Sequence, residues 1–129
     1  MATYCVKHTV AVTTVSGGTA TAYTGSKVTG LINNIRYVKP GSDGFADGST
    51  ITITGETTGT PILAITGMNA SATKPVRQAT CDVLGVASLY DTTDSEPVED
   101  KIAIADERIK IVVSSGGDAK TGTFYFTFE

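Results

Sequence analysis

Residues 108–129 read RIKIVVSSGGDAKTGTFYFTFE, and this segment is the strongest indication of the fold. Ile109 and Ile111 alternate with basic residues in its first part, and Phe124, Phe126 and Phe128 alternate with polar residues in its last part. Side chains two positions apart point to the same face of a strand, so the three phenylalanines meet one side of a core. The glycine-rich residues between the two parts predict a turn. The segment therefore predicts two amphipathic strands joined as a terminal hairpin.

The composition of the whole chain agrees with this local pattern. The 129 residues include 22 threonines, 12 valines and 10 isoleucines, but only 4 leucines. β-branched side chains lose rotamer freedom in a helix and pack well on a pleated sheet. We therefore expect β-structure nearly throughout the chain.

Further strands are predicted along the rest of the chain by alternation and by turn residues. Residues 4–15 alternate, with Val6, His8, Val10 and Val12 on one face, and a turn at Ser16–Gly18 leads to a returning strand that completes an N-terminal hairpin. Gly30 and the following asparagine pair oppose a long helix. The other predicted elements are a kinked strand or one short helical turn at 28–38, strands at 49–54 and 61–66, a longer strand region at 76–90 interrupted at Gly85, and an acidic loop at 91–100.

Short strands at intervals of roughly 8–15 residues, joined by glycine- and threonine-rich turns, are typical of an antiparallel sandwich. The length suits one ordinary domain, so we expect a single all-β sandwich over residues 1–129, of Greek-key or jelly-roll type. The predicted core consists of alternating apolar residues from the first, middle and last strands. They are Val6, Val10, Val12, Ile51, Ile53, Ile109, Ile111, Phe124, Phe126 and Phe128.

Charge and hydropathy exclude several kinds of partner. Ten basic and thirteen acidic residues give a net charge of -3, which offers no electrostatic reason to expect nucleic acid or anionic membrane. No apolar run approaches the ~20 residues that span a bilayer, and the first residues do not resemble a secretory signal. We expect folding in a cytoplasm, with Cys5 and Cys81 as free, buried thiols.

Candidate sites for chemistry are weak. His8 is the only histidine and lacks a companion, which favours a half-buried structural role over catalysis or metal binding. The acidic residues Asp91, Asp94, Glu96, Glu99 and Asp100 match no calcium-binding loop and predict a solvated loop. Residues 116–122 lack the spacing of a phosphate-binding loop and lead into a strand rather than a helix. We therefore predict no catalytic, cofactor-binding or metal-binding residue, and a protein that is not an enzyme.

The chain resembles the minor virion proteins of tailed bacteriophages. The resemblance lies in residues 108–124, which are similar to the terminal hairpin of short proteins encoded near phage head genes, and in a threonine- and glycine-rich composition without a signal. It implies a structural protein of the virion, made in the host cytoplasm, that forms homo-oligomers and contacts the major capsid protein or neighbouring virion proteins. A capsid decoration (cement) protein is the first expectation.

Alternatives remain open at this point. A neck, collar or tail protein would form a ring at the head–tail junction. Ring adaptors often anchor through extended arms, and the sequence reveals no long helix or insertion loop, which favours decoration. A receptor- or carbohydrate-binding module would need its tyrosines to be exposed together, since tryptophan is absent. The loops at 41–48 and 91–100 are the expected partner-facing surfaces, because loops of a sandwich usually carry binding.

Overall fold

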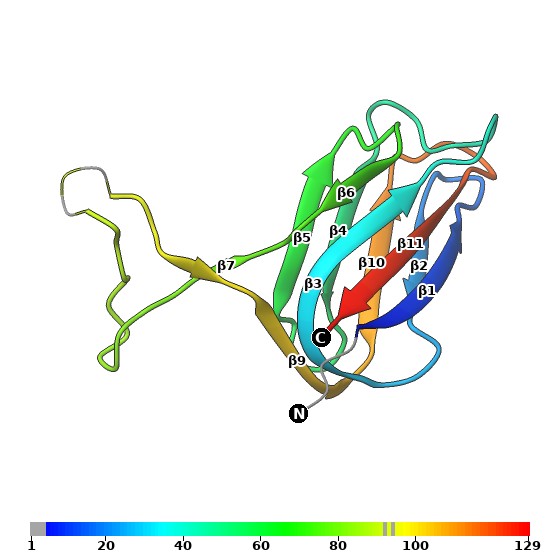
Figure 1. Ribbon diagram of the computed structural model, residues 1–129. Helices are drawn as coiled ribbons and strands as arrows, with labels where there is room; N and C mark the ends of the chain where they lie inside the picture. The colour runs from blue at the N-terminus through cyan, green and yellow to red at the C-terminus, as the bar shows by residue number, and fades with distance from the viewer. Residues whose placement is uncertain (1–4, 92, 94) are drawn as a thin grey trace.

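The computed structural model describes residues 5–91, 93 and 95–129 of the chain. All regular elements in these residues are strands, as the β-rich composition predicts (Figure 1). The strands are β1 (Val6–Thr13), β2 (Ala20–Tyr23), β3 (Val28–Val38), β4 (Thr50–Gly55), β5 (Pro61–Thr66), β6 (Ala72–Lys74), β7 (Gln78–Ala79), β8 (Glu99–Asp100), β9 (Ile102–Glu107), β10 (Ile109–Ser114) and β11 (Thr121–Phe128). The described residues contain no helix that is both long enough and apolar enough to cross a membrane.

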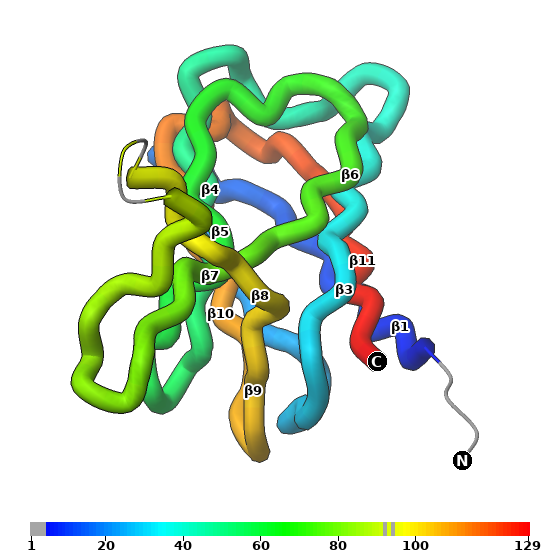
Figure 2. The backbone as a smooth tube through the Cα atoms, turned by 60° about the vertical axis from the view of Figure 1, so that its left-hand side comes forward, coloured from blue at the N-terminus to red at the C-terminus, as the bar shows by residue number. Residues whose placement is uncertain are grey.

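Two antiparallel sheets pack face to face, which confirms the predicted all-β sandwich (Figures 1 and 2). The first sheet has the order β1-β11-β3-β6, with β9 also paired to β3. The second sheet has the order β2-β10-β4-β5. Strands β7 and β8 form a small separate pair outside both sheets.

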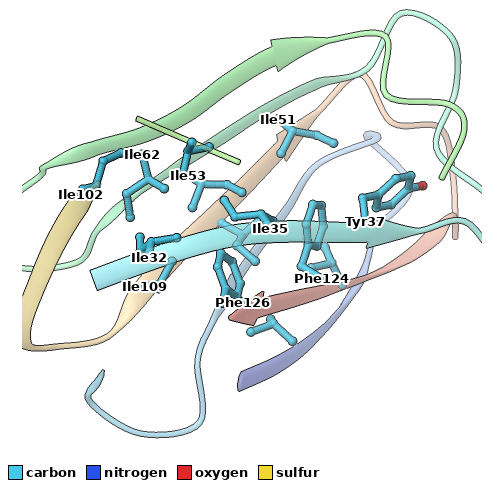
Figure 3. Close-up of a cluster of buried hydrophobic side chains, with 14 of the residues drawn as sticks. Ile32, Ile35, Tyr37, Ile51, Ile53, Ile62, Ile102, Ile109, Phe124 and Phe126 are labelled. Atoms are coloured by element: carbon cyan, nitrogen blue, oxygen red, sulfur yellow. The ribbon is translucent and has the colours of Figure 1, made fainter. Parts of the chain in front are cut away.

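The core lies between the facing sides of the two sheets (Figure 3). Burial alternates along the strands, so β11 buries Phe124, Phe126 and Phe128 while its threonines face outward. Nine of the ten predicted core residues are buried. Val6 is the exception: its side chain is 40% exposed at the start of the edge strand β1, and its prediction as a core residue is wrong.

Neither of the two hairpins expected from the sequence forms, so both predictions are wrong. Strand β10 pairs with β2 and β4 in the second sheet, whereas β11 pairs with β1 and β3 in the first. Likewise β2 does not return along β1 but crosses to β10. The turns after β1 and β10 are therefore arches between sheets. Strands β4 and β5 do form a hairpin, at the position expected for the strands at 49–54 and 61–66.

Strand β3 is a single kinked strand, which is the first of the two alternatives expected for residues 28–38. The glycine has φ +143°, and the register with β9 shifts between Val28 and Gly30. Beyond the kink, β3 exchanges partners on the side away from β11. Its first half pairs with β9 up to Ile32, and its second half pairs with β6 from Ile35 onward. The chain between β6 and β9 leaves the sandwich through this gap.

The longer strand predicted at 76–90 is wrong for most of its length. Only Val76, at its start, is buried in the core. The described residues of the segment 78–100, which we call the arm, project from the sandwich (Figure 1). The arm is an insertion between two strands that share one edge of β3, so removing it would leave the pattern of the two main sheets unchanged.

Candidate functional site

The base of the arm is attached to β3 at the gap between β6 and β9. There the guanidinium of Arg77 donates hydrogen bonds to the carbonyl oxygens of Asn33, at 3.1 Å, and Val76, at 2.7 Å. Asn33 lies between Ile32 and Ile35, where none of the described strands pairs with this side of β3. A charged side chain thus satisfies a backbone acceptor that the gap would otherwise leave without a strand partner.

The arm divides into a stem and two lobes. The stem is the pair β7–β8, in which Gln78 lies opposite Asp100. Beyond it the backbones of Thr80, Ser88 and Val98 form a three-way junction, because each of the three amides donates to the carbonyl of another. The first lobe, residues 81–87, closes at the β-bridge between Cys81 and Ala87. The second lobe, described for residues 89–91, 93 and 95–97, closes at the β-bridge between Leu89 and Pro97. Hydrogen bonds therefore give this surface segment a defined shape.

Asp82 organises the end of the first lobe. Its carboxylate oxygen accepts hydrogen bonds from the amides of Leu84, at 2.8 Å, and Val86, at 3.1 Å. Gly85 completes the turn with φ +79°, a conformation that glycine adopts without steric cost. The turn leaves Val83 and Leu84 pointing into solvent.

Apolar side chains are exposed on the arm to an unusual degree. Val83 is 100% exposed, Leu84 83% and Tyr90 75%. Val86 and Leu89 are also exposed, so five of the eight exposed large hydrophobic residues described belong to the arm. The exposed large apolar side chains described are thus concentrated on the arm rather than scattered evenly over the surface.

The arm also separates the charges of the molecule. Residues 78–100 contain six of the thirteen acidic residues and none of the ten basic ones. The remainder of the chain therefore holds ten basic and seven acidic residues, a net positive charge. The overall charge of -3 is therefore the sum of an acidic arm and a remainder with net positive charge.

A polar clasp fixes the β4–β5 hairpin beside the arm. Oε1 of Glu107, at the end of β9, accepts from the amides of Thr57, at 2.9 Å, and Thr58, at 3.1 Å, and its Oε2 accepts from the Thr58 hydroxyl. Hydrogen bonds from the Thr58 backbone lower the pKa of Glu107, against the opposing effect of burial. The guanidinium of Arg108 binds the Glu56 carboxylate of the same turn and lowers the pKa of Glu56. This clasp ties the two sheets together.

Two recesses lie along β5, the edge strand of the second sheet. One, of about 310 Å³, lies between β4, β5 and the base of the arm, where Arg77 contributes to its wall. The other, of about 140 Å³, lies between β5 and the segment that leads to β6, where Lys74 contributes to its wall. Leu63 of β5 lines the larger recess and Ile65 of β5 lines the smaller one, and neither recess has an acidic residue among its described lining.

The structure places the candidate residues of the sequence on separate surfaces. His8 is half-buried on β1, and its ring packs edge-on against Phe128 with centroids 5.4 Å apart, in keeping with a structural role. Asp91, Glu96, Glu99 and Asp100 are spread along the exposed arm, and Asp94 lies outside the described residues. Among the described side chains, no three potential metal ligands converge.

Both cysteines differ from expectation. Cys5 precedes β1 and Cys81 lies in the first lobe of the arm, and both are exposed free thiols. The expectation of buried thiols is therefore wrong. Their sequence surroundings resembled strands, but both segments lie at the margin of the sandwich or beyond it.

The tyrosines do not form a common platform. Tyr37 is buried in the core, whereas Tyr90 is exposed on the arm. Tyr125 lies under Lys7 on the first sheet, and Tyr23 lies under Arg108 on the second. Tyr4 is outside the described residues. The four described rings are dispersed, so the condition set for a tyrosine-based sugar site is not met by them.

Of the two loops expected to face partners, only one belongs to a projecting surface. The loop at 41–48 is held against the end of the sandwich, because Phe45 is buried and stacks on Tyr37 with centroids 5.7 Å apart. The loop at 91–100 is part of the arm. The sequence pattern did not predict the exposure of Val83 and Leu84, although the absence of basic residues from 78–100 sets this segment apart from the rest of the chain.

Comparisons with known proteins add little to this geometry. No protein-family model matches the chain, and no curated protein matches it either. A crystal structure of FLHE aligns over 97% of this chain and 97% of its own, with 10% sequence identity and a TM-score of 0.47. A similarity at this level supports no inference about function.

Proposed function

We propose that this chain is a non-enzymatic structural protein of a tailed-bacteriophage virion that contacts neighbouring subunits through its arm. The observation that carries the proposal is the arm itself, which presents Val83, Leu84 and Tyr90 to solvent on a hydrogen-bonded framework. Exposed apolar side chains are unfavourable in an isolated molecule and become favourable when a partner buries them. The partners would be the major capsid protein, neighbouring virion proteins or further copies of this chain.

The presence of the arm changes which of two positions in the virion we propose first, the capsid surface or a ring at the neck or tail. The preference for capsid decoration depends on the absence of an insertion loop from the sequence pattern, and the arm is such an insertion. Ring proteins of the neck or tail often anchor through extended arms, so we place a ring component ahead of a decoration protein. The rigid sandwich would form the body of the ring, and the arm would reach the adjacent subunit.

Quantitative mass spectrometry of purified particles tests this function. The amount of this chain is measured relative to the major capsid protein. A small fixed copy number that suits a closed ring is the expected result. A ratio close to that of the capsid protein would instead favour decoration, and absence from the particle would overturn the virion proposal.

Removing the arm separates its role from that of the sandwich. Residues 79–99 would be replaced by a short glycine–serine linker between Gln78 and Asp100, which already lie opposite each other in the stem. The sandwich should fold, because the core residues lie outside the replaced segment. Particles made with this variant should lack the chain or lose stability. Normal incorporation of the armless chain would contradict a role for the arm in assembly.

A further inference from the structure

Two features of the molecule lack a partner among the residues that the structure describes. The first is the outer edge of β5, which pairs with β4 on one side and with no strand on the other among the described residues. The second is the arm, whose sequence is compatible with strands but whose apolar side chains lie in solvent. An unpaired strand edge is a template for an incoming extended segment.

The β5 edge differs from the edge on the opposite side of the sandwich. There, the edge strands β1 and β2 contact each other where the chain passes between the sheets. Beside β5, the recesses of about 310 Å³ and 140 Å³ remain open. Main-chain groups and apolar pockets thus occur together along one edge, which is the arrangement that recognises an added strand.

The charges of the residues lining the two recesses indicate what kind of segment would bind along the β5 edge. The charged side chains lining the two recesses are Arg77 and Lys74, both basic. The arm has six acidic residues and no basic residue. An extended, acidic segment with aliphatic side chains is therefore the chemistry that this edge would recognise, and the arm of a second copy has that chemistry.

We propose that the arm of one copy binds along the β5 edge of a second copy, with aliphatic side chains of its lobes in the recesses and its carboxylates near Lys74 and Arg77. The arm extends away from its own sandwich, so its lobes are presented to a neighbouring molecule (Figure 1). The contact joins two different surfaces and is therefore heterologous, and repetition of such a contact closes a ring or extends a filament. This inference rests on the proposed assembly function and specifies how the copies would join.

Sedimentation velocity of the purified full-length chain over a range of concentrations tests the inference. The wild-type chain should associate as its concentration rises, and added salt should weaken the association because it screens the charges. The double substitution Val83→Asp and Leu84→Asp should abolish association through the arm. Ala64→Glu, which places an acidic side chain at the exposed β5 position beside the larger recess, should abolish it through the edge.

Matched controls use the same chemical changes elsewhere on the body. Val15→Asp alters an exposed valine in the turn after β1, and Ala11→Glu alters an exposed alanine of β1. Both control variants should associate like the wild type. Each variant is compared with the wild type by circular dichroism and thermal unfolding, so that loss of folding is recognised.

Mixing the two defective variants gives the decisive result. The Ala64→Glu chain has an intact arm, and the Val83→Asp/Leu84→Asp chain has an intact edge. Their mixture should form a dimer that does not grow further, although each variant alone is monomeric. A mixture that stays monomeric, or a wild-type chain that does not associate, would overturn the inference and assign the arm to a different protein. Copy number in the particle is a separate measurement, so either proposal can fail without the other.

Discussion

At the scale of single residues, the contribution of a side chain to stability depends more on its burial than on its residue type. Phe126 is fully buried between the sheets, whereas Val6 is 40% exposed on an edge strand. Both satisfy the same alternating pattern in the sequence. The pattern gives the phase of a strand correctly, but it does not reveal how far the opposing sheet extends along that strand.

Substitution of Phe126 by alanine should destabilise the protein by ~3–5 kcal/mol, since it removes a buried ring and leaves a cavity. Chemical unfolding followed by circular dichroism measures this loss. Val6→Ala is the control and should cost less than about 1 kcal/mol, as expected for an exposed position. Equal losses for the two variants would contradict the assigned core.

The clasp at Glu107 predicts a dependence of stability on pH. The pKa of Glu107 in the folded protein is lower than its ordinary value of 4.5, so folding favours the ionised form. This stabilisation is present above pH 4.5 and is lost as the pH falls through the lowered pKa of the folded state.

Thermal unfolding of the Glu107→Gln variant measures that contribution. The variant should have a lower Tm than the wild type at neutral pH, and the difference should shrink as the pH falls below 4.5. Glu99→Gln, which alters an exposed carboxylate of the arm stem, is the control and should follow the wild type. A Tm difference that stays constant down to acidic pH would argue against the ionised clasp.

At the scale of the elements, turns predict where the chain reverses but not which strand it meets. The glycine-rich segments after β1 and β10 do reverse the chain. In both cases the next strand joins the other sheet rather than pairing with its predecessor. A hairpin and an arch both place alternate side chains in the same core, so the two have the same hydrophobic pattern.

The kink of β3 depends on one glycine. Gly30 has φ +143°, and a Cβ atom at this position would lie 3.1 Å from the carbonyl oxygen of Glu129. Gly30→Ala should therefore destabilise the protein by about 1 kcal/mol or more, because alanine is strained in this conformation. Chemical unfolding measures the effect. Gly25→Ala is the control, since nothing lies within 4 Å of a Cβ there and its φ is not in the left-handed region.

The arm should be cut by a protease before the sandwich is. Lys and Arg are absent between Arg77 and Lys101, whereas Glu99 is exposed in the arm and is not followed by proline, unlike Glu96. A glutamate-specific protease should therefore cleave first in the arm, and the two fragments should remain associated through the core. Mass spectrometry of early digestion products checks the sites. Cleavage at Glu107 with comparable speed would contradict the stable clasp.

At the scale of the whole molecule, the sandwich and the arm have different physical roles. The sandwich buries the apolar side chains that stabilise the fold, and the arm exposes side chains whose burial requires another molecule. The proposed self-association would combine both, with a rigid body that spaces the copies and an arm that joins them. The acidic arm and the basic remainder of the chain favour such contact between molecules rather than aggregation of identical surfaces.

The sequence by itself determined the β class, most strand positions and nine of the ten core residues named, because alternation and β-branched composition are local properties. The tertiary structure alone decided which strands pair, since hairpins and arches have the same pattern. It also decided that residues 78–100 form an arm. Val83, Leu84 and Val86 resemble residues of a buried strand, and only the placement of β6 and β9 along β3 leaves them outside the sandwich. The exposed apolar side chains of the arm could not be predicted from the sequence, because the burial of a side chain depends on the contacts of the whole chain.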